Sequence, residues 1–292
     1  MKKFLPILML VTLVLAMIQG CSRRVAMQIK GSDTMVNLGQ AWAEAYMKEH
    51  PGTSIAVTGG GSGVGIAALI NGDTDIAQAS REMTQEEMNL AKKKGLNPQR
   101  FVVAQDGLSV IVNPKNPVSK LTIAQLSDIY TGKITNWKQV GGKNAPIVVL
   151  SRDKSSGTHV FFLEHVVRKG NPKGTEEYGR SVLMQVSSQA IAEEVAQNEN
   201  AIGYVGMGYV DRSKHKTIAV AKAAGYPYVE PTVENVLNGS YPVARQLYFY
   251  TPNKPTGNVK DFIDFVLSDA GQRIVAKLEF VPIRTVAKEA SK

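Results

Sequence analysis

The sequence contains a single cysteine and only four histidines among 292 residues, and this scarcity excludes several kinds of site. One cysteine cannot form an intramolecular disulfide, and it leaves no thiol pair for a structural zinc site. His50, His165 and His215 have no metal-ligand spacing with one another. The glycine-rich residues 59–65 match neither of the common nucleotide phosphate-binding patterns, G-x-G-x-x-G and G-x-x-x-x-G-K-[ST]. We therefore expect no metal and no organic cofactor.

A long apolar run occurs only near the N-terminus. Residues 4–18 follow a short basic region and have the length of a signal peptide, whereas a membrane span needs roughly 20 apolar residues. Residues 18–21, Ile-Gln-Gly-Cys, resemble the lipobox of a bacterial lipoprotein. We expect a signal peptide over residues 1–20, a lipid such as palmitate on Cys21, and a tether over residues 21–26. This arrangement would anchor the remaining chain to the cell envelope, outside the cytoplasmic membrane.

Positive charge exceeds negative charge, but it is not concentrated in one place. The formal charge is +9 at pH 7, and removal of the two lysines of the signal peptide leaves +7. Only residues 92–94 form a run of lysines. They end a helical pattern over residues 85–94, where cations complement the helix dipole and face water. We therefore expect no nucleic-acid partner, although a modest positive field helps to recruit small anions.

Apolar strand patterns alternate with helical patterns along the mature chain, as in α/β proteins with parallel sheets. About 270 residues are more than one core usually holds, so we expect two α/β lobes. The predicted strands cover residues 27–30, 54–57, 75–80, 101–104, 108–112, 147–150, 202–205 and 244–250. The predicted helices cover residues 64–70, 85–94, 121–130, 187–198 and 259–278, with two more beginning after residue 34 and near residue 159.

Three strand-to-helix junctions carry hydroxyl groups and glycines. They are residues 31–34 (Gly-Ser-Asp-Thr), residues 58–63 (Thr-Gly-Gly-Gly-Ser-Gly) and residues 151–158 (Ser-Arg-Asp-Lys-Ser-Ser-Gly-Thr). The first turn of a helix has unpaired N–H groups and partial positive charge, which suits an anion. Arg152 adds a planar fork for two oxygens, and Gly157 allows the backbone to approach closely. Because ligands of open α/β sheets bind beyond the carboxyl ends of strands, we expect one shared tetrahedral oxyanion.

The order and spacing of several motifs resemble those of a known family. The motifs are residues 31–34, residues 60–63 (Gly-Gly-Ser-Gly), residues 75–81 (Asp-Ile-Ala-Gln-Ala-Ser-Arg), residues 106–108 (Asp-Gly-Leu), residues 129–137 (Ile-Tyr-Thr-Gly-Lys-Ile-Thr-Asn-Trp), residues 152–158 and residues 200–204 (Asn-Ala-Ile-Gly-Tyr). Together they resemble the phosphate-binding receptor of the bacterial high-affinity phosphate ABC transporter. The resemblance implies the type II periplasmic binding-protein fold, in which two α/β lobes are joined by two hinge strands and the ligand lies in the cleft.

The same resemblance implies where the lobes divide and which residues contact phosphate. Lobe one would be discontinuous, formed by residues 27–108 and 243–292, and lobe two would be formed by residues 109–242. The hinge strands would be residues 108–112 and 247–250. The implied phosphate-binding residues are Ser32, Thr34, Met35, Ser62, Ser80, Arg81, Arg152, Ser156, Gly157 and Thr158.

The sequence departs from the family pattern at residues 80–81. Some members carry a carboxylate there, which accepts the proton of monohydrogen phosphate and excludes sulfate, whereas this chain has Ser80 and Arg81. Ser80 can still accept a hydrogen bond, and Arg81 would strengthen charge pairing. Asp33 or Asp106 is a further candidate for the acceptor, although each also fits the role of a helix-cap or turn aspartate.

The resemblance implies a transport receptor. It would be a monomer that binds inorganic phosphate, closes about its hinge and is then read by the permease subunits of an ABC transporter. A receptor for sulfate, molybdate or arsenate, and a phosphate-sensing or adhesion protein on the same fold, are the alternatives. Ser156 lies close before His159 in the sequence, but no Asp-His orienting motif accompanies this pair, so we expect no enzyme activity.

Overall fold

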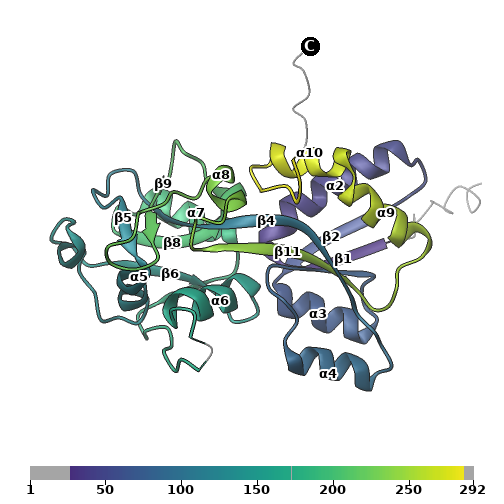
Figure 1. Ribbon diagram of the computed structural model, residues 1–292, viewed down its shortest axis with the longest axis horizontal. Coiled ribbons are helices and arrows are strands. Elements are labelled where there is room, and N and C mark those ends of the chain that lie inside the picture. The colour runs from purple at the N-terminus through teal and green to yellow at the C-terminus, as the bar shows by residue number, and fades with distance from the viewer. Residues whose placement is uncertain (1–26, 172, 286–292) are drawn as a thin grey trace, which may run out of the picture.

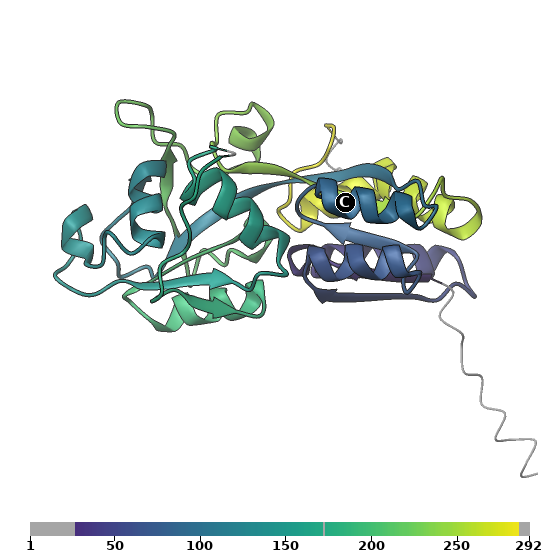
Figure 2. The ribbon, with the colours of Figure 1, turned by 90° about the horizontal axis from the view of Figure 1, so that it is seen from below.

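The computed structural model describes residues 27–171 and 173–285. The predicted signal peptide, the lipidation of Cys21 and the tether over residues 21–26 therefore lie outside the described residues. Figure 1 shows an elongated molecule with two bodies of helices and strands, connected by the long strands β4 and β11. The view turned by 90° shows the same two bodies side by side (Figure 2).

One mixed sheet runs through both bodies. Within the described residues its order is β2-β1-β3-β11-β4-β8-β6-β7, and β9 also pairs with β4. Strands β1, β2 and β3 are parallel, as are β6, β7 and β8, whereas β11 and β4 are antiparallel to their neighbours. The bounds are β1 Met27–Gly31, β2 Ile55–Gly60, β3 Ile76–Ala79, β4 Gln99–Val112, β6 Val148–Arg152, β7 Leu183–Gln185, β8 Ala201–Gly206, β9 Lys216–Thr217 and β11 Ala244–Thr251. A separate parallel pair consists of β5 Lys120–Thr122 and β10 Ala219–Ala221.

Side-chain caps fix where many of the helices begin. Thr84 and Thr122 form capping boxes with Glu87 and Gln125, so two orphan N–H groups are satisfied at each helix start. The bounds are α2 Val36–Glu49, α3 Ser62–Asn71, α4 Gln85–Lys93, α5 Ile123–Tyr130, α6 Gly157–Phe162, α7 Ser188–Gln197, α8 Val233–Leu237, α9 Gly257–Leu267 and α10 Asp269–Lys277. A 3-10 helix, η1 (Asp33–Met35), precedes α2, and a π-helix, η3 (Leu163–Val167), continues α6. Among the described residues, none of the helices combines the length and apolar character needed to cross a membrane.

Buried apolar side chains form two large cores, one in each body. The first core surrounds Trp42, and we call this body lobe one; the second surrounds Trp137, and we call this body lobe two. Strand β4 contributes Val103 to the first core and Val110 to the second, so it belongs to both bodies. Strand β11 pairs with residues 99–107 of β4, and residues 108–112 of β4 pair with β8, so β4 continues from the sheet of lobe one into that of lobe two.

One predicted helix and two predicted strands are wrong in extent. The single helix predicted over residues 259–278 is divided into α9 and α10, because Ser268 has extended backbone and its Oγ accepts a hydrogen bond from the N–H of Gly271. The polar cap thus interrupts a continuous apolar pattern. The two strands predicted over residues 101–104 and 108–112 are one strand, β4, because the residues between them stay in register with β11.

Candidate functional site

Four buried hydroxyl groups meet where elements of the two lobes face each other. Thr34 follows β1, Ser62 begins α3 and Ser80 follows β3, whereas Thr158 lies in the first turn of α6. The Oγ1 atoms of Thr34 and Thr158 are 2.8 Å apart. Ser80 Oγ lies 3.3 Å from Ser62 Oγ and 3.4 Å from Thr158 Oγ1. We call these four residues the hydroxyl cluster, and each of them is almost completely excluded from solvent.

Glycine is required at two positions beside the cluster, because segments of the two lobes approach closely there. A Cβ atom on Gly157 would lie only 2.3 Å from Ser62 Oγ. Gly61 has a φ angle of +104°, and a Cβ atom on it would lie 2.6 Å from the carbonyl oxygen of Ser155. The same carbonyl accepts a hydrogen bond from the N–H of Gly63 at 3.0 Å. A larger residue at either glycine would therefore hold the lobes apart.

A buried cation that the sequence analysis did not identify contacts the cluster from β11. Arg245 Nη1 donates to Thr158 Oγ1 at 3.0 Å, and its Nη2 donates to Thr34 Oγ1 at 3.4 Å. Its Nε and Nη2 also donate to Asp106 Oδ2, at 3.0 and 2.8 Å. Burial lowers the pKa of Arg245, and the charge of Asp106 opposes this effect. Arg245 therefore brings a compensated positive charge to hydroxyls of both lobes.

The sequence did contain a signal for this pair. Arg245 is a basic residue within a strand of otherwise mostly apolar residues, and Asp106 lies between two apolar strand segments. Residues of this kind seldom become fully buried unless they are paired. The two residues face each other in the ladder of β4 and β11, and their side chains are 2% and 0% exposed. The pairing of distant strands, which the sequence pattern does not reveal, is what brings them together.

Arg152 is buried near the cluster, but its hydrogen bonds join other groups. Its Nε and Nη2 donate to the carbonyls of Gln185 and Val186 at 3.3 and 3.0 Å. Its Nη1 donates to Ser188 Oγ at 3.1 Å and to Asp33 Oδ2 at 3.2 Å. Since Asp33 belongs to lobe one, Arg152 links the two lobes in this structure.

Arg81 is held by helix α4. Its Nη1 and Nη2 donate to the two carboxylate oxygens of Glu87 at 2.8 and 2.7 Å, and Nη1 also donates to the Glu82 carbonyl at 2.7 Å. Such a bidentate pair fixes the plane of the guanidinium group. The structure therefore places Ser80 in the hydroxyl cluster and binds the charged end of Arg81 to α4.

The other predicted binding residues lie in the same junctions. Ser32 Oγ is buried and has no hydrogen-bond partner among the described residues, so it is available to a ligand. Met35 is buried, and its N–H donates to the Ser32 carbonyl at 3.1 Å. Ser156 Oγ caps α6, because it accepts from the N–H groups of Thr158 and His159 at 3.2 and 3.4 Å.

Both carboxylates considered as acceptors of a ligand proton already have partners. Asp33 Oδ2 accepts from Arg152 and from the N–H of Ser188 at 2.7 Å, at the start of α7. Asp106 binds Arg245 through Oδ2 and accepts from the N–H of Met207 through Oδ1 at 3.0 Å. Asp106 is thus the buried counter-ion of an arginine, and Asp33 joins the lobes.

Ser156 and His159 are not arranged as a nucleophile and its base. His159 Nδ1 lies 2.8 Å from the Arg152 carbonyl oxygen, and its ring packs against Tyr178 with centroids 4.5 Å apart. Burial lowers the pKa of His159. No group of three residues that could hold a metal occurs in the part of the chain that the structure describes. The arrangement suits binding, because its polar groups are hydroxyls, backbone amides and a paired arginine.

Such a set of groups fits a tetrahedral oxyanion. A hydroxyl group donates one hydrogen bond and accepts up to two, so the cluster can pair with oxygens that carry a proton or lack one. Ser62 also begins the ten-residue helix α3, whose N-terminus carries partial positive charge. The structure therefore brings Thr34, Ser62, Ser80 and Thr158 together, with Arg245 as their cation.

Comparison with known proteins gives the family. Residues 22–270 match the model of the PBP superfamily domain. The phosphate-binding protein PstS of Pseudomonas aeruginosa is 34% identical over 280 residues, which cover 90% of this chain and 84% of the relative. Among solved structures, a putative phosphate ABC transporter substrate-binding protein with bound phosphate from Clostridium perfringens is 39% identical, with a TM-score of 0.79, and the match covers 88% of this chain and 99% of that one. An ABC-type phosphate transport receptor from Vibrio cholerae is 32% identical, with a TM-score of 0.69 and coverage of 87% and 99%.

These relatives bear the names of binding proteins and receptors, in agreement with the expectation of no enzyme activity. The predicted α/β fold of the type II periplasmic binding proteins is confirmed by the family model and by the solved structures. The family predicted from the sequence motifs is confirmed as well. The chain belongs to the family of PstS-type phosphate-binding proteins of phosphate ABC transporters, within the PBP superfamily.

Proposed function

We propose that the protein binds inorganic phosphate between its lobes and delivers it to the permease subunits of an ABC transporter. The observation that carries this proposal is the hydroxyl cluster, in which Arg245 donates to a lobe-one hydroxyl, Thr34, and to a lobe-two hydroxyl, Thr158. A dianion that leaves water needs both many donors and a nearby cation. The bound phosphate of the relative from Clostridium perfringens supports the choice of ligand.

Binding would proceed by hinge closure. Lobe one, residues 27–108 and 243–292, first contacts the anion through Ser32, Thr34, Met35, Ser62 and Ser80. Lobe two, residues 109–242, then closes and adds Arg152, Ser156, Gly157 and Thr158. The lobes would turn about the connection formed by strands β4 and β11, which are paired with each other. The permease would then recognise the closed, phosphate-bound form.

Selection of phosphate over sulfate would depend on a hydrogen-bond acceptor for the ligand proton. The hydroxyl oxygens of the cluster and of Ser32 can accept such a bond, although they carry no charge. An unpaired buried oxygen typically costs about 1–3 kcal/mol, so sulfate, which has no proton to donate, would bind more weakly. Without a carboxylate at residues 80–81 this preference would be smaller than in relatives that have one.

Calorimetric titration of the purified protein with phosphate, sulfate and arsenate tests the proposal. We expect phosphate to bind, and Thr158→Val to raise its dissociation constant about 10- to 100-fold, because a hydrogen bond to a charged group contributes about 1.5–3 kcal/mol. Thr256→Val is the matched control, since Thr256 is exposed and its side chain caps nothing. Equal binding of sulfate would change the ligand to another oxyanion, and absence of all binding would refute the anion site.

The protein would be lipid-anchored and extracytoplasmic. This proposal rests on the lipobox-like residues 18–21 and on the apolar residues 4–18 before them. A fatty-acyl chain on Cys21 would tether the lobes near the permease, and the protein would act as a monomer. Metabolic labelling with palmitate in a bacterial host checks it: the label should appear on the unchanged protein and disappear in Cys21→Ala. Labelling that persists in the variant would place the lipid elsewhere.

A further inference from the structure

A tyrosine of lobe two reaches the turn of lobe one that is predicted to bind phosphate. Tyr209 Oη donates a hydrogen bond to the carbonyl oxygen of Asp33 at 2.8 Å. We propose that Tyr209 is a positioning residue for phosphate binding, which holds the Asp33–Thr34 peptide so that the Thr34 N–H faces the anion and donates more strongly to it. The inference rests on the proposed function and adds a residue that the sequence motifs did not indicate.

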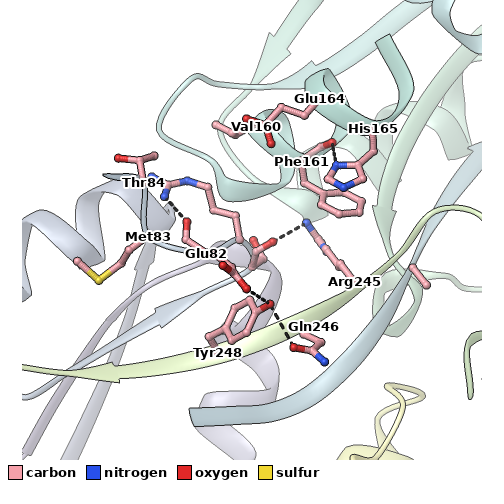
Figure 3. A pocket seen from close by; sticks show the side chains of 13 residues that line it. Glu82, Met83, Thr84, Val160, Phe161, Glu164, His165, Arg245, Gln246 and Tyr248 are labelled. Carbon is pink, nitrogen blue, oxygen red and sulfur yellow. Dashed lines mark hydrogen bonds between the residues drawn. The ribbon is translucent and has the colours of Figure 1, made fainter. Parts of the chain in front are cut away.

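An anion at the hydroxyl cluster depends on donors that lie between the lobes. Arg245 closes the cluster toward a neighbouring cavity of about 620 Å³ (Figure 3), because its Nη1 donates to the Ser80 carbonyl at 3.3 Å and to Thr158 Oγ1 at 3.0 Å. Arg245, Ser80 and Thr158 are all buried. The hydrogen bonds of the anion therefore come from this enclosed space, where backbone N–H groups at the starts of helices are natural donors.

The direction of the Asp33–Thr34 peptide follows from its hydrogen bonds. The Asp33 carbonyl oxygen accepts from the N–H of Val36 and from Tyr209 Oη. Because the peptide is trans, the Thr34 N–H points away from these two donors. It lies in the first turn of η1, where an N–H group has no partner within the helix. Since Thr34 Oγ1 belongs to the hydroxyl cluster, the N–H and the hydroxyl of this residue can meet one anion.

A hydrogen bond to the carbonyl of a peptide strengthens the N–H of the same peptide as a donor. Consecutive hydrogen bonds polarise one another, by roughly 10–30% per bond, and a buried site with a low dielectric constant makes each of them stronger. The bond from Tyr209 should therefore improve the Thr34 N–H as a donor to an anion. Since Tyr209 belongs to lobe two, lobe two acts in this way on a donor of lobe one.

Two glycines allow the segment that carries Tyr209 to lie close against lobe one. The segment is a short 3-10 helix that directly follows β8 and ends at Tyr209. A Cβ atom on Gly206 would lie 2.9 Å from Thr34 Cγ2, and a Cβ atom on Gly208 would lie 2.4 Å from the Phe280 ring. Side chains at these two positions would push the segment away from lobe one and withdraw the Tyr209 hydroxyl group.

Contacts that do not involve the ligand fix the side chain of Tyr209. Its ring packs against a buried apolar cluster formed by residues of β4, β6, α7 and β8. Met207, two residues earlier, donates its N–H to Asp106 Oδ1 at 3.0 Å. Burial and the nearby charge of Asp33 raise the pKa of Tyr209, so the phenol keeps its proton and remains a donor at neutral pH.

The effect of Tyr209 can be separated from that of the Asp33 carboxylate. Asp33 Oδ2 accepts from Arg152 and from the N–H of Ser188, whereas Tyr209 binds the backbone carbonyl. Tyr209→Phe removes one hydroxyl group and keeps the packed ring. The Asp33 carbonyl retains the N–H of Val36 in this variant, so no buried acceptor is left without a partner.

Calorimetric titration of the whole protein with inorganic phosphate tests the inference. We expect the dissociation constant to rise about 3- to 10-fold in Tyr209→Phe, a change of about 0.6–1.4 kcal/mol. The midpoint of denaturant unfolding of the ligand-free variant should equal that of the unchanged protein. Tyr228→Phe is the matched control, because its ring is exposed and lies beside Lys120, and it should bind phosphate like the unchanged protein.

NMR spectroscopy observes the proposed donor directly. Phosphate should move the proton resonance of the Thr34 N–H to lower field, because the amide then donates to an anion. At saturating phosphate this displacement should be smaller in Tyr209→Phe than in the unchanged protein and in Tyr228→Phe. A residue that only supports the fold would leave the resonance of the saturated protein in place.

The outcomes distinguish the inference from the proposed function. If the unchanged protein does not bind phosphate, the proposed function is wrong and the inference is lost with it. If the unchanged protein binds phosphate and Tyr209→Phe binds it equally well, only the inference is wrong. Weaker binding with an unchanged Thr34 resonance would show that Tyr209 merely joins the lobes. A variant that fails to fold, or whose unfolding midpoint falls while the resonance stays in place, would assign Tyr209 to the fold and overturn the positioning role.

Discussion

At the scale of single residues, the Asp106–Arg245 pair combines stability and ligand binding. Removal of one partner from a buried pair leaves an uncompensated charge and costs about 3–5 kcal/mol. We expect Arg245→Gln to lower the free energy of unfolding by about this amount and to abolish tight phosphate binding. The double variant Arg245→Gln with Asp106→Asn should regain most of the stability, because an amide pair replaces the charges, but it should not regain phosphate affinity.

Denaturant unfolding and calorimetry on the same samples separate these two roles. Denaturant unfolding reports the contribution of the buried ion pair to stability. Calorimetry reports the contribution of the Arg245 charge to anion binding. A double variant that is stable and binds phosphate like the unchanged protein would show that Arg245 supports only the fold. Tight binding by the single variant Arg245→Gln would lead to the same conclusion.

At the scale of elements, the sequence predicted the helices and strands whose ends are set by residues within or next to the element. Helix α4 lies where the lysine-ended pattern places it, because Thr84 and Glu87 form a capping box. The break between α9 and α10 was missed, because one capping serine interrupts a continuous apolar stripe. The π-helix η3 and the short strand β7 were also missed, since neither has a sequence pattern of its own. Elements that depend on neighbouring residues can thus be predicted from the sequence, whereas elements that depend on contacts with distant segments cannot.

The candidate site likewise contains residues that the sequence predicted and residues that it did not. Thr34, Ser62 and Thr158 were predicted because each lies at a strand-to-helix junction, which is a local pattern, whereas Ser80 was implied only by the resemblance to the family. Arg245 was missed because it lies within a strand and reaches the cluster only through the pairing of β11 with β4. For Arg152 the predicted ligand role stays a prediction, and its observed bonds to Asp33 and Ser188 could not be foreseen from the sequence.

At the scale of the whole molecule, Asp33 of lobe one joins lobe two through three hydrogen bonds in this structure. Its Oδ2 accepts from Arg152 Nη1 at 3.2 Å and from the N–H of Ser188 at 2.7 Å, and its carbonyl accepts from Tyr209 Oη at 2.8 Å. We expect Asp33→Ala to shift the protein toward the open form. Apparent affinity falls with the population of the competent form, so phosphate binding should weaken about tenfold.

Small-angle X-ray scattering with and without phosphate measures this change in shape. The ligand-free variant should have a larger radius of gyration than the ligand-free unchanged protein, and saturating phosphate should remove the difference. Lys260→Ala is the control, because its pair with Asp264 is exposed and lies within α9, away from the contact between the lobes. Identical scattering and affinity in Asp33→Ala would show that closure does not depend on this carboxylate.

The discontinuous core of lobe one has a consequence for the order in which the chain can fold. Trp42 Nε1 donates to the carbonyl of Gly271, a residue 229 positions later in the sequence, and the Trp42 ring packs against Phe249. During synthesis from the N-terminus, the apolar face of α2 stays uncovered until β11, α9 and α10 have emerged. Lobe two lies between β4 and β11 and has all of its strands earlier. The first described residues therefore belong to a core that needs the last helices of the chain, and a holding chaperone would have its longest task there.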